Sequence, residues 1–433
     1  MLRAIFIAII ILIGTFYAVI SPFYGLLFYL WNAYFRPEEW LFWLDVKSLH
    51  LSLIIGWYVV IRSFFSFPNP QISWRTVLLI LFLLQAMLGT LTSEHPIVSQ
   101  VYLPDFIKVI VISYLIVVMV TDRSKFRLTL IVISLSLGLE CAKQGWASLI
   151  LAPGQKNDNN IGFLGDNNGV ALGTMMLVPI IGALAQTTRT RWKQFAYWFI
   201  AVGVFLRGFT TYSRGGFLAA AVLGLFVFAR AEKKVRALIG VALVAGLVVT
   251  VMPREYWNRI DTITAEEDNR DESAAGRLHF WRIGVEMARA KPFTGVGLNS
   301  FSPSYATYDP NSFWGEGRQA HSTWFGVLAE LGVPGLAIFL ANLSLAFLSC
   351  RRIVLQTRDD PDARDLRIYA NALLTSFVVF AVGGTFLSSQ YNEMLWHFFA
   401  LSTALSLVRT AEVEARERTV EVALPMGRYA VAR

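Results

Sequence analysis

Long apolar stretches alternate with short polar segments along almost the whole chain. After an apolar first segment over residues 1–36, such stretches lie at 48–66, 76–94, 103–121, 128–151, 168–187, 193–210, 214–230, 235–252, 322–350, 367–387 and 391–408. A helix needs about 20 apolar residues to cross ~30 Å of hydrocarbon. The pattern therefore predicts an all-α polytopic membrane protein with about twelve transmembrane helices.

The first 36 residues decide the exact number of spans. Pro22 interrupts this apolar segment, and we expect one membrane span followed by an interfacial or re-entrant piece. No small-residue cleavage site follows the apolar run, so we interpret it as a retained span rather than a signal peptide. The alternative is a thirteenth span, which would place the N-terminus outside.

Composition supports a membrane protein and excludes a disulfide-rich one. The 433 residues are 55% hydrophobic and only 16% charged, against about 25% charged in soluble domains. The mean hydropathy is +0.52. The net charge of +8 is not a nucleic-acid signal here, because lysine and arginine collect in cytoplasmic loops of membrane proteins and fix their orientation. The two cysteines, Cys141 and Cys350, lie in or beside apolar runs and form no disulfide framework.

The loops alternate in charge, which predicts their side of the membrane. Basic or mixed segments lie at 122–127, 187–193, 230–236 and 351–367 and after Arg409. By the positive-inside rule these segments and both termini are cytoplasmic. We therefore expect four parts: an N-terminal transmembrane bundle of about ten spans (1–252), a long helical outer loop (253–321), C-terminal transmembrane helices (322–409) and a cytoplasmic tail (410–433).

Two arginines break the charge rule on the outer side. Arg207 and Arg214 bracket the short outer link 206–216. Either they extend to lipid head groups at the membrane surface, or they form an anion site, since guanidinium groups bind phosphate bidentately and stay charged when partly desolvated.

The long outer loop contains a predicted amphipathic helix over 273–292, with Arg277 in its first turns and Lys291-Pro292 ending it. A helix start with an arginine is a potential anion site, although a helix lying on the bilayer with its arginines in solvent has the same pattern. The following segment, 293–301, is a glycine-spaced turn that can bring backbone close to a ligand. The acidic run 264–273 lacks the spacing of a calcium loop, and we expect no metal.

One histidine and one carboxylate stand out near the next apolar run. His321 lies where this helix is expected to begin, and its ordinary pKa of about 6.5 suits a general base. Glu330 lies ~13.5 Å deeper on the opposite side of a straight helix, so the two residues cannot form a dyad. We expect Glu330 to be a buried partner of a polar group on a neighbouring helix, with either a functional or a structural role. A structural role for His321 is the alternative to catalysis.

These motifs in this order resemble the O-antigen ligase family of bacterial inner membranes. The resemblance runs over roughly residues 100–410 and rests on "GDNNGVALG" (165–173), "YSRGGFLA" (212–219), "GRLHFWRIG" (276–284), "PFTGVGLNSF" (292–301) and "HSTWFGVLAELGVPG" (321–335). The family is similar in fold to the GT-C glycosyltransferases, and its members take a glycan from undecaprenyl pyrophosphate on the periplasmic face. The start of the chain also resembles the O-glycosylation ligases associated with exosortases, which leaves the acceptor open.

The resemblance implies an inverting, metal-independent glycosyltransferase without a cofactor, located in the inner membrane with a periplasmic active site. Its expected partners are the lipid bilayer, an undecaprenyl-pyrophosphate-linked donor and lipid A-core as acceptor. His321 is the implied base, and Arg207, Arg214, Arg277 and Arg318 are the candidate pyrophosphate contacts. The candidate supporting residues are Asp166, Asn168, Tyr212, Trp281, Asn299, Ser322 and Glu330.

Two kinds of alternative function remain open. An O-antigen polymerase or a protein O-glycosylation ligase would use the same donor. A transporter of lipid-linked sugars would also need outer arginines and the intramembrane charges Asp105, Lys108, Glu140 and Lys143. Transporters often contain internal repeats, and the two halves of this chain show no convincing repeat.

Overall fold

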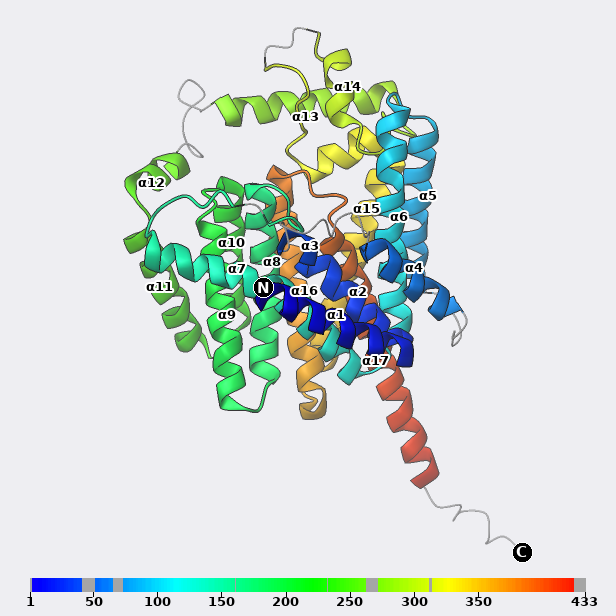
Figure 1. Ribbon diagram of the computed structural model, residues 1–433, viewed down its shortest axis with the longest axis vertical. Helices are drawn as coiled ribbons and strands as arrows, with labels where there is room; N and C mark the ends of the chain where they lie inside the picture. The colour runs from blue at the N-terminus through cyan, green and yellow to red at the C-terminus, as the bar shows by residue number, and fades with distance from the viewer. Residues whose placement is uncertain are drawn as a thin grey trace, which may run out of the picture.

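The protein is a bundle of helices with a smaller helical layer across one end (Figure 1). The computed structural model describes residues 2–40, 51–64, 73–159, 161–231, 233–261, 272–310 and 314–423. Within these residues the regular structure is helical, apart from one isolated β-bridge. The acidic run 264–273 and the predicted stretch at 48–66 lie partly outside the described residues, as does the end of the tail.

The helices of the bundle are α1 (Leu2–Ile20), α2 (Pro22–Phe35), α3 (Pro37–Trp40), α4 (Leu51–Phe64), α5 (Trp74–Leu91), α6 (Pro96–Met119), α7 (Arg123–Leu151), α8 (Asn167–Thr187), α9 (Arg191–Phe209), α10 (Arg214–Arg230), α11 (Lys234–Val251), α15 (Thr323–Gln356), α16 (Arg364–Gly383) and α17 (Glu393–Ala423). The segment between α11 and α15 contains α12 (Arg254–Asp261), α13 (Glu272–Ala290) and α14 (Phe301–Tyr308). Figure 1 shows α13 lying across the end of the bundle.

The predicted apolar stretches coincide with helices. Six helices of the described part are long and apolar enough to cross a membrane: α5, α6, α8, α11, α15 and α16 with its flanking 3-10 turns. The protein is thus an all-helical polytopic membrane protein, while the count of twelve spans and the GT-C likeness stay predictions. The break expected at Pro22 is present, because α1 ends at Ile20 and α2 begins at Pro22.

Helix α8 forms the centre of one half of the bundle. It packs against α7, α9, α10 and α16, and most of its residues are buried. Small residues let the neighbouring backbones approach closely, as in other membrane bundles. A Cβ atom added at Gly145 of α7 would lie 1.9 Å from the carbonyl oxygen of Gly203 on α9. The glycines at this contact are therefore required by the close packing.

Helix α15 is broken in its first third. Gly332 has a φ of 69°, which interrupts the helix and leaves carbonyl groups without intrahelical partners. The loop before α14 fills this gap: Val296 N–H donates to the carbonyl of Ala329 at 2.9 Å, and Gly297 N–H to that of Glu330 at 3.1 Å. Buried backbone groups at membrane depth need such partners within the protein. Two backbone N–H groups of the glycine-spaced turn thus pair with α15.

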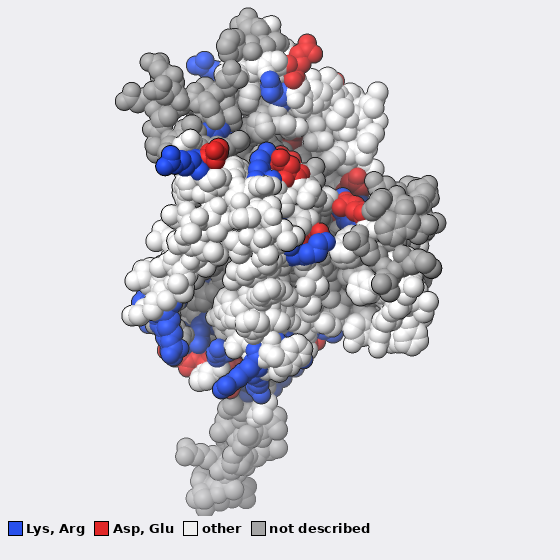
Figure 2. Space-filling model, turned by 60° about the vertical axis from the view of Figure 1, so that its left-hand side comes forward, with Lys and Arg blue, Asp and Glu red and all other residues white. Residues whose placement is uncertain are grey.

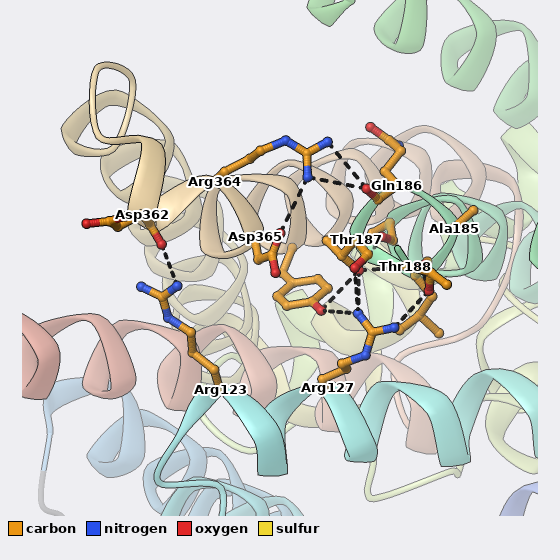
Figure 3. A network of polar contacts seen from close by, with 12 residues as sticks. Arg123, Arg127, Ala185, Gln186, Thr187, Thr188, Asp362, Arg364 and Asp365 are labelled. Atoms are coloured by element: carbon orange, nitrogen blue, oxygen red, sulfur yellow. Dashed lines mark hydrogen bonds and ion pairs between the residues drawn. The ribbon is translucent and has the colours of Figure 1, made fainter. Parts of the chain in front are cut away.

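Arginines join α7, α8 and α16 (Figure 3), at the end of the bundle opposite α13 (Figure 1). Arg127 on α7 donates to Thr187 Oγ1 of α8 at 2.8 Å and to Tyr369 Oη of α16 at 3.2 Å. Arg364 at the start of α16 donates to the carbonyl of Gln186 at 3.3 Å. The basic loop residues therefore fasten helix ends to one another as well as giving this end its charge.

Lys and Arg side chains gather with a few acidic ones at the lower end of the face in Figure 2, and a largely uncharged region lies between them and the charged groups higher on that face. This distribution agrees with the predicted orientation, in which the tail is cytoplasmic. The orientation itself stays a prediction.

A pair of introduced cysteines tests this orientation. Thr307 on α14 and Asp359 after α15 are both exposed, and each is replaced by cysteine after the two buried native cysteines have been changed to serine. We expect an impermeant thiol reagent to label Thr307→Cys in intact cells and Asp359→Cys only after the membrane is opened. The reverse pattern would contradict the topology.

Candidate functional site

A polar cavity of about 600 Å³ lies beside the start of α15. Its wall combines residues from α6, α8, α17 and the loops between helices, namely Arg36, Tyr102, Asp105, Phe106, Lys108, Val109, Gly162, Phe163, Leu164, Gly165, Asp166, Gly169, Asn299, Gln319, His321, Leu387, Ser388, Ser389, Gln390, Tyr391, Asn392 and Glu393. Three predicted site residues, His321, Asp166 and Asn299, meet in this wall. A cavity with a few convergent polar groups is the usual form of a small-molecule site.

His321 has a strained backbone at the cavity wall. Its φ is 46°, immediately before Ser322, which is the N-cap residue of α15. The other non-glycine residues with positive φ in the described chain are Arg36, Tyr212 and Asn299, and all of these except Tyr212 also line the cavity. Left-handed backbone is uncommon outside glycine, and its clustering is typical of functional sites.

The surroundings of His321 favour its neutral form. Burial lowers the pKa of the imidazole below its usual 6.5, and the positive charges of Arg277 and Arg318 lower it further, while Asp166 acts in the opposite direction. Since the pKa is lowered, His321 is neutral at pH 7 and becomes protonated only below pH 6.5. A neutral imidazole can accept a proton.

Glu330 is fully buried within the protein and has three hydrogen-bond donors. Its Oε1 accepts from the Phe301 N–H at 3.1 Å, and its Oε2 accepts from Gln390 Nε2 at 3.0 Å and Tyr391 Oη at 2.8 Å. The expected polar partners are present, but they lie in loops and at the start of α14 rather than on a neighbouring helix. Glu330 therefore holds together segments that carry the cavity wall.

Arg207 has a different environment from the one predicted. Its side chain is fully buried, with Nε donating to Gln144 Oε1 at 2.8 Å and Nη2 to the carbonyl of Asn159 at 2.6 Å. It is absent from the cavity wall. These protein partners give Arg207 a structural role, and we do not retain it as a pyrophosphate contact.

The remaining residues of the 206–216 link organise the neighbouring loops. Tyr212 Oη donates to the carbonyl of Gly154, and Ser213 Oγ donates to Asn168 Oδ1 at 2.9 Å. Arg214 is buried at the first turn of α10 and does not line the cavity. Tyr212 and Asn168 thus fix the loop that presents Arg214.

The other predicted residues surround the start of α15. Arg277 on α13 and the exposed Arg318 are close enough to influence the charge of His321. Trp281 stacks on Phe325 with ring centroids 5.1 Å apart. Ser322 is buried, and its Oγ has no hydrogen-bond partner among the described residues.

Two cations in the cavity wall were not proposed as site residues. Arg36 follows directly after α2 in a left-handed conformation, and Lys108 on α6 forms an ion pair with Asp105 at 3.0 Å. Two features of the sequence could have pointed to these cations. One is the charged cluster "FRPEEW" (35–40) directly after an apolar run, and the other is the pair of Asp105 and Lys108 within another apolar run. Their convergence depends on tertiary packing between α2 and α6, which the sequence pattern does not reveal.

Comparisons with known proteins give two family matches. The O-antigen ligase family model matches residues 195–340, which confirms the resemblance seen in the sequence. A family of unknown function (DUF5935) matches residues 1–187. The exopolysaccharide production protein ExoQ of Rhizobium meliloti (strain 1021) is 24% identical over 188 residues, which are 40% of this chain and 39% of that protein. The match thus spans well under half of this relative. The cavity wall contains residues from both matched regions.

The effect of Arg277 on His321 is testable without any substrate. Replacing Arg277 by glutamine removes a positive neighbour, so the pKa of His321 should rise towards 6.5. NMR titration of histidine-labelled protein measures this pKa, with His321→Gln used to assign the signal. Arg289→Gln is the control, since Arg289 is paired with Glu286 at 2.7 Å and has no part in lowering the His321 pKa. An unchanged or lower pKa in Arg277→Gln would contradict the electrostatic picture.

Proposed function

We propose that the protein is an inverting, metal-independent glycosyltransferase that moves a glycan from undecaprenyl pyrophosphate to an acceptor hydroxyl on the periplasmic face of the bacterial inner membrane. The observation that carries this proposal is the placement of His321: a neutral, strained histidine at the wall of a 600 Å³ polar cavity, within a region that matches the O-antigen ligase family. Lipid A-core is the proposed acceptor, as in the ligases.

The proposed chemistry needs one proton acceptor and positive charge at the leaving group. The acceptor hydroxyl attacks the anomeric carbon and transfers its proton to His321, while the bond from that carbon to the pyrophosphate breaks with inversion. The electron pair leaves with the pyrophosphate, and Arg277, Arg318 and Arg214 neutralise the developing charge. Positioned charges of this kind stabilise a transition state most strongly where water is scarce.

A polymerase is the second candidate, because the similarity to an exopolysaccharide production protein favours transfer to another glycan. Purified protein should be offered lipid A-core, a glycan and a peptide as acceptors with the same labelled donor. Formation of a new glycosidic bond separates all transferases from a transporter, and the labelled product identifies the acceptor.

The first functional prediction concerns His321→Gln. Glutamine can hydrogen-bond but cannot take up the proton, so we expect transfer to fall by about 10²–10⁴-fold while lipid-linked donor still binds. The native rate should also fall as the pH decreases below 6.5 and His321 becomes protonated. Loss of a general base should leave only about 1/10² to 1/10⁴ of the native rate. If the glutamine variant keeps more than about a tenth of the native rate, a far smaller loss than that, His321 is a positioning residue only.

The second functional prediction compares arginines. Arg214→Gln and Arg277→Gln should each weaken donor use by about 10- to 150-fold, the equivalent of about 1.5–3 kcal/mol for one charge-assisted contact. Lysine should restore activity only in part, because it lacks the planar fork. Arg289→Gln is the matched comparison and should leave donor use unchanged, since Arg289 is exposed on the same helix as Arg277 and pairs with Glu286 at 2.7 Å. Equal donor affinity in all three variants would exclude the two proposed contacts.

A further inference from the structure

A second cavity of about 210 Å³ lies next to the main one. The two cavities share Arg36, Gly162 and Phe163 as lining residues. Every residue of the smaller cavity falls between positions 34 and 163, inside the region that matches the family of unknown function. The proposed reaction assigns no role to this cavity.

The polar wall of the smaller cavity is held by a chain of hydrogen bonds. Lys143 Nζ contacts Glu140 Oε2 at 2.8 Å, and Gln144 Nε2 donates to Glu140 Oε1 at 2.9 Å. Arg207 Nε in turn donates to Gln144 Oε1 at 2.8 Å. The buried guanidinium of Arg207 therefore fixes the amide that orients the Glu140 carboxylate.

The boundary between the cavities depends on a glycine. A Cβ atom added at Gly162 would lie 1.6 Å from Glu39 Oε1, so only glycine lets this carboxylate lie against the shared wall. Arg36 is paired with Glu39 at 3.4 Å. The carboxylate of Glu39 and the guanidinium of Arg36 are thus both held at the point where one cavity passes into the other.

Charge and shape indicate the class of ligand. The smaller cavity has two carboxylates, Glu39 and Glu140, balanced by Arg36 and Lys143, so its wall has no excess charge to attract an anion. Carboxylate, amide and guanidinium groups present paired donors or acceptors, which match neighbouring hydroxyl groups of a sugar. Aromatic rings complete the wall, with the Tyr34 and Phe163 centroids 4.1 Å apart.

We propose that the smaller cavity is a second sugar-binding subsite, which holds an uncharged sugar residue of the glycan one or more units away from the reacting end in the main cavity. This inference rests on the proposed function for the identity of the main cavity. It gives the N-terminal region the task of recognising the glycan, while the region matching the ligase family contains the proposed base. The glycan belongs either to the donor or to the acceptor.

Binding of glycan fragments tests the subsite without relying on transfer. The probes are fragments of the host's own surface polysaccharide, released by mild acid and separated by length, and the protein is the full chain in lipid nanodiscs. The native protein should bind longer fragments more tightly than single sugars. The measured quantity is the affinity for a longer fragment divided by the affinity for a single sugar. Glu140→Gln and Gly162→Ala should each reduce this ratio by about tenfold, because each variant disturbs one hydrogen bond between the sugar and a charged group. Glu414→Gln, which changes a carboxylate paired with Arg418 at 3.4 Å far along α17, should leave the ratio unchanged.

A transfer assay then separates the two sources of the glycan. A raised KM for the lipid-linked donor in Glu140→Gln and Gly162→Ala assigns the subsite to the donor, and a raised KM for the acceptor assigns it to the acceptor. Length-dependent binding without any transfer by the native protein would support the subsite and refute the proposed function. Native transfer with no change of the length dependence in either variant would overturn the subsite alone, as would the absence of fragment binding to the native protein.

Discussion

The cavity depends on one buried carboxylate. Glu330 accepts hydrogen bonds from the start of α14 and from the loop before α17, so a single side chain joins three segments that are far apart in the sequence. Burying a carboxylate costs several kcal/mol unless its partners are all present. The cost is offset only when Phe301, Gln390 and Tyr391 are in place together, and for this reason the wall of the cavity forms as a unit. His321 lies directly before the N-cap residue of the same helix and lines the same cavity as Gln390 and Tyr391.

The break in α15 extends this constraint to the backbone. Gly332 releases carbonyl groups that regular helix would have satisfied, and the 292–297 loop and Gln85 supply the donors, with Gln85 Nε2 2.8 Å from the Leu331 carbonyl oxygen. The segments around the cavity are thus held by hydrogen bonds at helix ends and at the helix break, as well as by packing between helices. Arg36, Asn299 and His321 lie around the cavity in left-handed conformations, which persist only where the surrounding structure determines them.

The sequence predicted what depends on local pattern. Apolar length located the helices, Pro22 located the first break, and isolated charges in apolar context singled out His321 and Glu330. It could not tell that Arg207 is held inside the protein: Arg207 was grouped with Arg214 because both bracket one loop, yet its partners are 48 and 63 residues away. Arg36 was missed for the same reason, since only the packing of α2 against α6 brings it beside Lys108.

The distribution of charge limits how the proposed substrates can be arranged. Arg36 and Lys108 in the main cavity face three carboxylates, those of Asp105, Asp166 and Glu393. A pyrophosphate would be repelled by such a wall, because like charges at short range cost energy and the cavity has no excess of cations. We therefore propose that the pyrophosphate binds closer to Arg277 and Arg318, whose positive charges act on His321, and that sugar rings occupy the cavity. In an inverting displacement the attacking hydroxyl and the pyrophosphate lie on opposite faces of the anomeric carbon, so in the proposed reaction His321 would have to reach the hydroxyl while the arginines reach the phosphates.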